Sequence, residues 1–87
     1  TGLIFAVNYQ GKDFFLLMTT DKKLNISSVS VLHADKVPSA KGLKIYNQFA
    51  GQAVNKVSIS AKTPLEKAVQ LAVKRAGMLL YVRLKGA

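Results

Sequence analysis

The sequence predicts an α+β fold: an N-terminal three-stranded meander followed by a helix–strand–helix–strand unit, in one mixed sheet with the helices on one face. Three observations lead to this prediction: apolar runs separated by polar turns in the first half, a helix start signal at Thr63, and an alternating run after Gly77. With 87 residues, the chain has room for a single domain, residues 1–87, with a small core.

Three apolar runs in the first half predict the strands of the meander. These runs are residues 3–10, 14–20 and 24–31. Polar turns separate them, as expected for antiparallel neighbours. In the third run, the step from Ile26 to Val29 breaks the period of two, which predicts a bulge or a late strand start near Ser27-Ser28. Residues 33–42 follow as a predicted loop.

The middle of the chain predicts a fourth strand after a segment that is open to two interpretations. In residues 43–54, apolar side chains recur at helical spacing, but Gly51 and the weak helix formers Asn47 and Gln48 leave helix and loop both open. Residues 55–61 alternate apolar and polar side chains and predict a strand.

The strongest local signal predicts a helix that begins at Thr63. Thr63 is a favourable N-cap, Pro64 suits the first helical position, and Glu66 completes a capping box. An apolar stripe at helical spacing follows. It comprises Leu65, Ala68, Val69, Ala72, Val73 and Ala76. Gly77 is predicted to end the helix.

Residues 78–85 alternate again and predict the last strand. After a right-handed crossover, this strand would lie parallel to residues 55–61 and make the sheet mixed.

Composition narrows the function classes. Without cysteine, disulfides and thiolate metal sites are excluded. His33 is the sole histidine and the four carboxylates are scattered along the sequence, so we expect no metal and no cofactor. Nucleotide-binding and nucleophile motifs are absent, so we expect no enzyme. No apolar run is long enough to span a membrane. The compartment stays open, with an intracellular location favoured.

Charge is the informative quantity, because 13 basic residues against 4 acidic residues give a net charge of +9. Such an excess predicts a polyanionic partner, nucleic acid first. Lysine predominates over arginine, which suits contacts with phosphate better than base readout. The predicted phosphate-binding residues are Lys12, Lys22, Lys23, Lys36, Lys41, Lys44, Lys62, Arg83 and Lys85. We expect the loop lysines among them to converge into one patch.

Two aromatic side chains are candidates for stacking on bases. Phe15 follows Phe14 in a strand, so the two point to opposite faces. Tyr81 lies with Arg83 on the outer face of the predicted last strand. The alternative is a structural or assembly protein, such as a viral, particle or linker component, that docks its basic face on an acidic protein partner.

The C-terminal third resembles the small-subunit platform ribosomal protein S-eleven family. The resemblance rests on Thr63-Pro64 before an alanine-rich helix, Gly77, an alternating strand, and Lys85-Gly86. It implies a strand after the helix and binding to ribosomal RNA and neighbouring proteins. Together with the charge, it leads us to expect RNA over DNA as the partner, in a ribosomal or ribonucleoprotein particle. The predicted helix is about a turn shorter than in that family, residues 43–54 have no clear counterpart there, and the glycine-rich run and second helix that should follow Lys85-Gly86 are absent. Residues 57–75 are also similar in outline to the archaeal chromatin protein Alba and related RNA binders.

Overall fold

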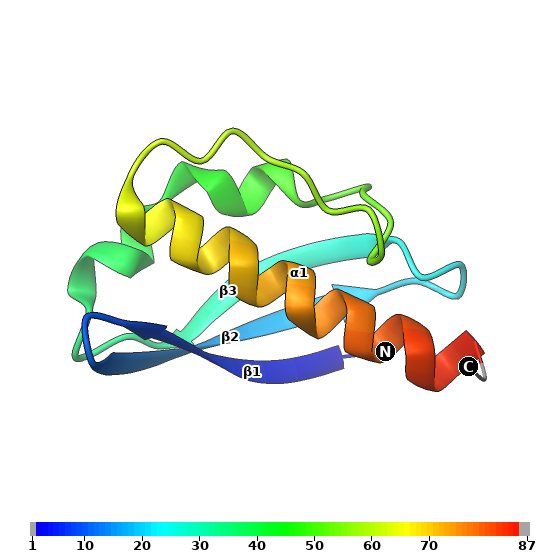
Figure 1. The fold of residues 1–87 in the computed structure, drawn as a ribbon, viewed down its shortest axis with the longest axis horizontal. Coiled ribbons are helices and arrows are strands. Elements are labelled where there is room, and N and C mark those ends of the chain that lie inside the picture. Colours follow the sequence, from blue (N-terminus) through cyan, green and yellow to red (C-terminus); the bar gives the residue numbers. More distant parts are fainter. Residues whose placement is uncertain (1, 86–87) are drawn as a thin grey trace.

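Three antiparallel strands and one long C-terminal helix organise the chain in a computed structural model that describes residues 2–85, except for the side chain of Lys85 (Figure 1). The elements in order are β1 (Gly2–Tyr9), β2 (Lys12–Thr20), β3 (Ile26–His33), the 3₁₀ helices η1 (Pro38–Gly42) and η2 (Lys44–Gln48), and α1 (Pro64–Lys85). The fold is thus broadly α+β, but the predicted helix–strand–helix–strand unit and mixed sheet are wrong.

The meander is confirmed, with strand order β1-β2-β3. Gln10 and Gly11 join β1 to β2 with φ angles of 54° and 78°. Two central residues with positive φ make the tight turn that matches the twist of an antiparallel hairpin. The bulge in β3 is also confirmed: Ser28 is opposite Thr19 and Ile26 is opposite Thr20, so Ser27 is an extra residue.

The capping box at the start of α1 forms as predicted. The Thr63 hydroxyl accepts a hydrogen bond from the Glu66 N–H at 3.1 Å, and the Glu66 carboxylate accepts one from the Thr63 N–H at 3.1 Å. The predicted end at Gly77 is wrong, because α1 has 22 residues and continues past Gly77 to Lys85. The strand predicted for residues 78–85, which the family resemblance also implies, is therefore the last part of this helix.

Gly77 is needed for close packing rather than for a helix stop. It is not among the glycines with positive φ, which in the described chain are Gly11 and Gly51. A Cβ atom at position 77 would overlap the backbone carbonyl oxygen of Val54. The absence of a side chain lets α1 approach the backbone of the preceding segment, and the helix runs on through this contact.

The strand predicted for residues 55–61 is also wrong, although its alternation is real. Val57 is buried while Ser58 and Ser60 are exposed. Glutamine side chains take the place of a neighbouring strand: the Gln52 amide bonds the Ser58 N–H at 2.7 Å and the Ser58 carbonyl at 2.8 Å, and the Gln48 amide oxygen accepts from the Ser60 N–H at 3.1 Å. Extended backbone satisfied by side chains forms no strand ladder.

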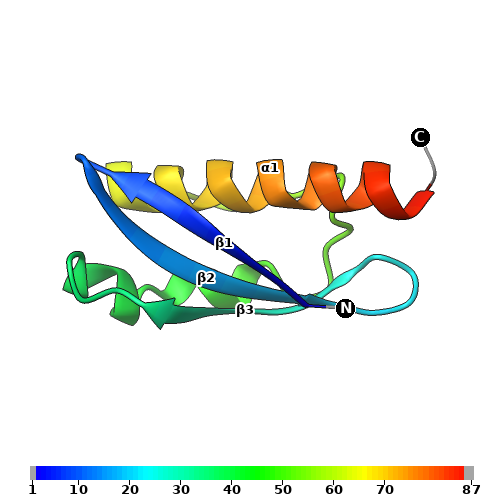
Figure 2. The ribbon, with the colours of Figure 1, turned by 90° about the horizontal axis from the view of Figure 1, so that it is seen from below.

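The ambiguous segment 43–54 is mostly irregular, with η2 as its only helical part. Residues 34–63 wrap from β3 to α1, and together with α1 they cover one face of the sheet (Figures 1 and 2). The largest fully buried side chains lie between these layers. They include Phe14, Leu16, Met18, Ile45, Phe49, Val69 and Val73. The opposite face of the sheet is uncovered by any described element.

Candidate nucleic-acid interface

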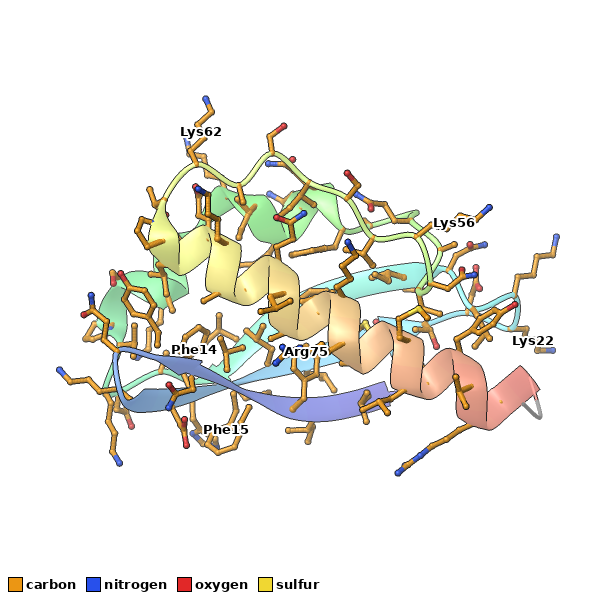
Figure 3. The ribbon with its side chains drawn as sticks, viewed as in Figure 1. Phe14, Phe15, Lys22, Lys56, Lys62 and Arg75 are labelled. Atoms are coloured by element: carbon orange, nitrogen blue, oxygen red, sulfur yellow. The ribbon has the colours of Figure 1, made fainter. Side chains whose placement is uncertain are left out.

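The uncovered sheet face carries an exposed apolar centre on β1 and β2. Phe14 is fully buried, whereas Phe15 points to the other side and is 39% exposed (Figure 3). Its ring and the His33 ring on β3 form a T-shaped pair, with centroids 6.5 Å apart and planes at 86°. Ile4, 61% exposed, is opposite Leu17 in the register. The face therefore presents one accessible aromatic ring beside two aliphatic side chains.

Short polar side chains surround this centre. The Asn8 amide donates to the Asp13 carboxylate at 2.8 Å, and the hydroxyls of Thr19 and Ser28 share a hydrogen bond of 2.7 Å. Asp13 is opposite Asn8 in the register, close to the first hairpin turn. Its negative charge opposes anion binding at that end of the face.

One group of lysines lies at the first-hairpin end, where β1 turns into β2. Lys12 begins β2 at this turn, and β3 ends at the same end of the sheet, where His33 pairs with Phe15. Lys36 and Lys41 follow β3 in sequence at the same end. Lys41 lies 3.6 Å from the Asp35 carboxylate, and both side chains are exposed.

A second group lies at the second-hairpin end, where Lys22 and Lys23 join β2 to β3. Lys56 extends at this same end (Figure 3) because the Val54 N–H bonds the Leu24 carbonyl at 3.0 Å and brings the two segments together. The turn is held by the Asp21 carboxylate, which accepts backbone hydrogen bonds from Asn25 and Lys23, both at 2.9 Å. The bond from the Asn25 N–H is the main reason that the pKa of Asp21 lies below its usual value of 3.8.

The lysines do not form the single patch that we expected. Consecutive turns of an antiparallel meander lie at opposite ends of the sheet, and β2 between them is 9 residues long, or about 27 Å. Lys62 lies near the start of α1, away from Lys22 (Figure 3). Lys44 begins η2, Arg83 lies on α1, and the side chain of Lys85 is outside the described residues.

Few carboxylates are paired with basic side chains, because some of them accept hydrogen bonds from the backbone instead. Glu66 accepts hydrogen bonds from the backbone N–H groups of Lys62, at 3.0 Å, and Thr63. These bonds hold the pKa of Glu66 below its usual value of 4.5. Of the basic side chains in residues 2–84, only Lys41 has a carboxylate within 4 Å. The excess of positive charge, +9 over the sequence, is therefore not neutralised by ion pairs among these described side chains.

Tyr81 is not on an exposed strand face, because residue 81 belongs to α1. Its side chain is half-buried and packs against the core, so Phe15 is the better placed of the two stacking candidates. Sequence reasoning missed Ile4 and Leu17 as neighbours of Phe15. Alternation within β1 and β2 could have identified them, since each has the parity that faces away from Phe14.

No protein-family model, curated protein or solved structure matches this chain. Within residues 2–85, no three histidine or carboxylate side chains come together as metal ligands. The one α-helix among these residues is not apolar enough over its length to cross a membrane.

Proposed function

We propose that this protein is a non-enzymatic RNA-binding domain that holds a single strand along its uncovered sheet face, as part of a ribonucleoprotein particle. The position of Phe15 supports this proposal most directly. An exposed aromatic ring on an open sheet is a stacking platform for a base, worth about 1–3 kcal/mol. The lysines at the two hairpin ends then bind phosphates on either side of the stacked base.

Charge supplies most of the affinity in this proposal. A strand that crosses the face lengthwise runs from the first-hairpin end, where Lys12 and Lys36 lie, to the second-hairpin end, where Lys22 and Lys23 lie. Each neutralised phosphate releases counterions, so affinity falls steeply with salt. RNA is favoured over DNA because the hydroxyl groups of Thr19 and Ser28 at the edge of the apolar centre are suited to contacts with a 2′-hydroxyl.

The test measures RNA binding by fluorescence anisotropy at several salt concentrations. We compare Lys12→Gln/Lys36→Gln and Lys22→Gln/Lys23→Gln with a control of equal charge on α1, Lys67→Gln/Lys74→Gln. Losing two phosphate contacts lowers the slope of log K against log salt by about 1.4. Both hairpin variants should show this change, and the control should show little. Equal changes in all three, or no detectable binding at low salt, contradict the proposal.

Two single substitutions test the path of the strand. Phe15→Leu keeps an apolar side chain but removes the aromatic face, and should weaken binding roughly tenfold. Asp13→Asn removes the negative charge while it keeps a partner for Asn8, and should strengthen binding roughly twofold to threefold. If neither change alters affinity, the RNA does not lie on this face.

The second candidate function is assembly by docking on an acidic protein. Ile4 and Leu17 favour it, because an exposed apolar patch is typical of a protein contact. Polyglutamate as competitor separates the two functions. Under this alternative, polyglutamate displaces RNA at equal charge concentration and Phe15→Leu has no effect on either ligand.

A further inference from the structure

A different surface, the free edge of the sheet, carries an inference beyond RNA binding. β1 has a neighbour on one side only. In the described chain, no backbone hydrogen bond outside its ladder with β2 involves β1, whereas the opposite edge is partly paired: the Gly51 N–H bonds the Ile26 carbonyl at 2.7 Å. β1 contains neither proline nor a charged residue. Proteins commonly use such residues to protect exposed edges, so this edge is open to pairing.

The hairpin register tells which backbone groups are available at this edge. Tyr9 and Lys12 flank a two-residue turn and so form a hydrogen-bonded pair. Alternation along the ladder then directs the N–H and C=O groups of Ile4, Ala6 and Asn8 away from β2. An incoming strand would find donors and acceptors at these three residues.

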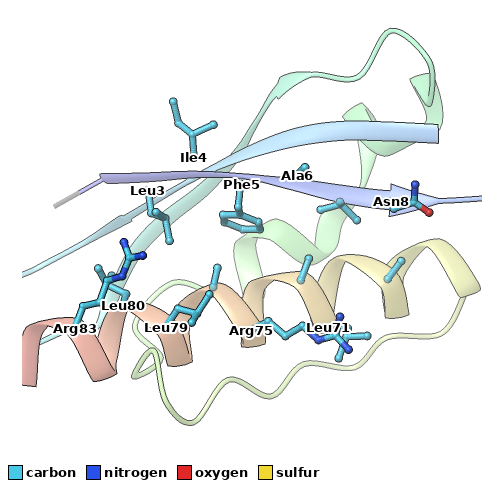
Figure 4. A pocket seen from close by; sticks show the side chains of 14 residues that line it. Leu3, Ile4, Phe5, Ala6, Asn8, Leu71, Arg75, Leu79, Leu80 and Arg83 are labelled. Carbon is cyan, nitrogen blue, oxygen red and sulfur yellow. The ribbon is translucent and has the colours of Figure 1, made fainter. Parts of the chain in front are cut away.

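A groove of about 560 Å³ runs between β1 and α1 (Figure 4). Phe5 lines its sheet side, and Leu71 and Leu79 line its helix side while remaining 49% and 63% exposed. Arg75 and Arg83 belong to the same helix side, and both are exposed. A strand added to β1 would fill the groove and cover the two leucines.

We propose that the β1–α1 groove binds an extended segment of a partner protein as a fourth strand, through two acidic side chains with an apolar one midway between them. The spacing follows from α1. Arg75 and Arg83 are eight residues apart, or about 12 Å along the helix, which equals about four residues of a strand. Leu79 lies midway. Side chains at i, i+2 and i+4 of a strand share one face, so they meet Arg75, Leu79 and Arg83 together.

Charge complementarity favours this occupant over a second copy of the chain. Two copies paired through β1 would bring four arginines to one interface, and β1 itself offers no carboxylate to them. Each copy also carries a net charge of +9. An acidic segment neutralises both arginines and satisfies the backbone edge at once.

The test uses a seven-residue peptide with glutamate at its second and sixth positions, valine at its fourth and threonine elsewhere. We expect NMR titration of the whole chain to shift the amide signals of Ile4, Ala6 and Asn8. The variant Arg75→Glu/Arg83→Glu should bind this glutamate peptide with roughly tenfold lower affinity. The same variant should bind a peptide with lysine in place of both glutamates better than the original chain does. Lys56→Glu/Lys67→Glu has the same net charge outside the groove and should bind the glutamate peptide nearly as the original chain does.

Backbone pairing is tested separately with Ala6→Pro. The N–H of Ala6 points away from β2, and edge strands tolerate proline at such positions. The fold should therefore persist in this variant, while peptide binding is lost. A glutamate peptide whose third and fifth backbone nitrogens are methylated lacks N–H donors for β1, so it should bind neither the original chain nor Ala6→Pro. The proposal is overturned if the arginine and control variants lose affinity equally, if the chain sediments as a dimer through β1, or if RNA binds this edge and displaces the peptide.

Discussion

Replacing Gly77 by alanine tests the packing of α1 on the backbone of Val54. Helix propensity alone favours alanine over glycine by about 1 kcal/mol in a helix interior. The new Cβ, however, would overlap the Val54 carbonyl oxygen and lie 3.2 Å from the Val54 Cβ. That backbone cannot withdraw freely, because the Val54 N–H is bonded to the Leu24 carbonyl at 3.0 Å. The helix must therefore move.

Displacing α1 loosens its contacts with the core, where Val73 and Leu80 are buried on either side of the contact. Overpacking of this kind typically costs about 1–3 kcal/mol, and here it acts against a backbone carbonyl rather than a flexible side chain. Taking the upper end of that range, about 3 kcal/mol, less the gain of about 1 kcal/mol in propensity, we expect Gly77→Ala to lower the free energy of unfolding by about 2 kcal/mol. Urea denaturation followed by circular dichroism measures this difference.

Gly42→Ala is the matched control, since a Cβ at position 42 meets no atom within 4 Å and the residue has no positive φ. It should change stability by less than about 0.5 kcal/mol. Met78→Pro asks separately whether the helix continues: it should cost about 3 kcal/mol inside α1, but little if the helix ended at Gly77. An increase in stability for Gly77→Ala of the size that propensity predicts would refute the close packing.

Three further predictions follow from the same structure. Phe14→Ala should cost about 3–5 kcal/mol, whereas Phe15→Ala, on the uncovered face, should cost less than about 1 kcal/mol; urea denaturation of both variants compares the two faces. Thr63→Ala should lower the free energy of unfolding by about 1 kcal/mol through loss of the N-cap, with Thr63→Ser close to the original. The pKa values of Asp21 and Glu66 are lowered by folding, so their contribution is complete above the ordinary values of 3.8 and 4.5 and disappears as pH falls through the folded values. Asp21→Asn/Glu66→Gln should therefore lose less stability between pH 5 and pH 3, in denaturation repeated across this range, and a loss as steep as that of the original chain would contradict the assignment.

Local patterns in the sequence were sufficient for the first half and for the start of α1. Alternation and turn residues predicted the meander, because hairpin partners are close in sequence and a single buried face dictates the period. The capping box was predicted for the same reason, since Thr63 and Glu66 are three residues apart. The opposite orientations of Phe14 and Phe15 could be predicted from the strand assignment alone, because successive side chains of a strand point to opposite faces.

Tertiary contacts decided the second half. An alternating run such as residues 78–85 suits a strand, yet α1 continues there because Gly77 allows the helix to pack on Val54, a contact between distant segments. The segment 55–61 has the alternation of a strand, but the amides of Gln48 and Gln52 satisfy its backbone, so no ladder forms.

The candidate sites divide in the same way. The sequence alone determined a large uncompensated positive charge, because charge depends only on composition. Where the cations lie was a tertiary question: the antiparallel order of β1, β2 and β3 places successive turns at opposite ends, so the lysines form two groups instead of one. The groove between β1 and α1 exists only because the helix lies along a free sheet edge, a juxtaposition of residues some seventy positions apart that no local pattern encodes.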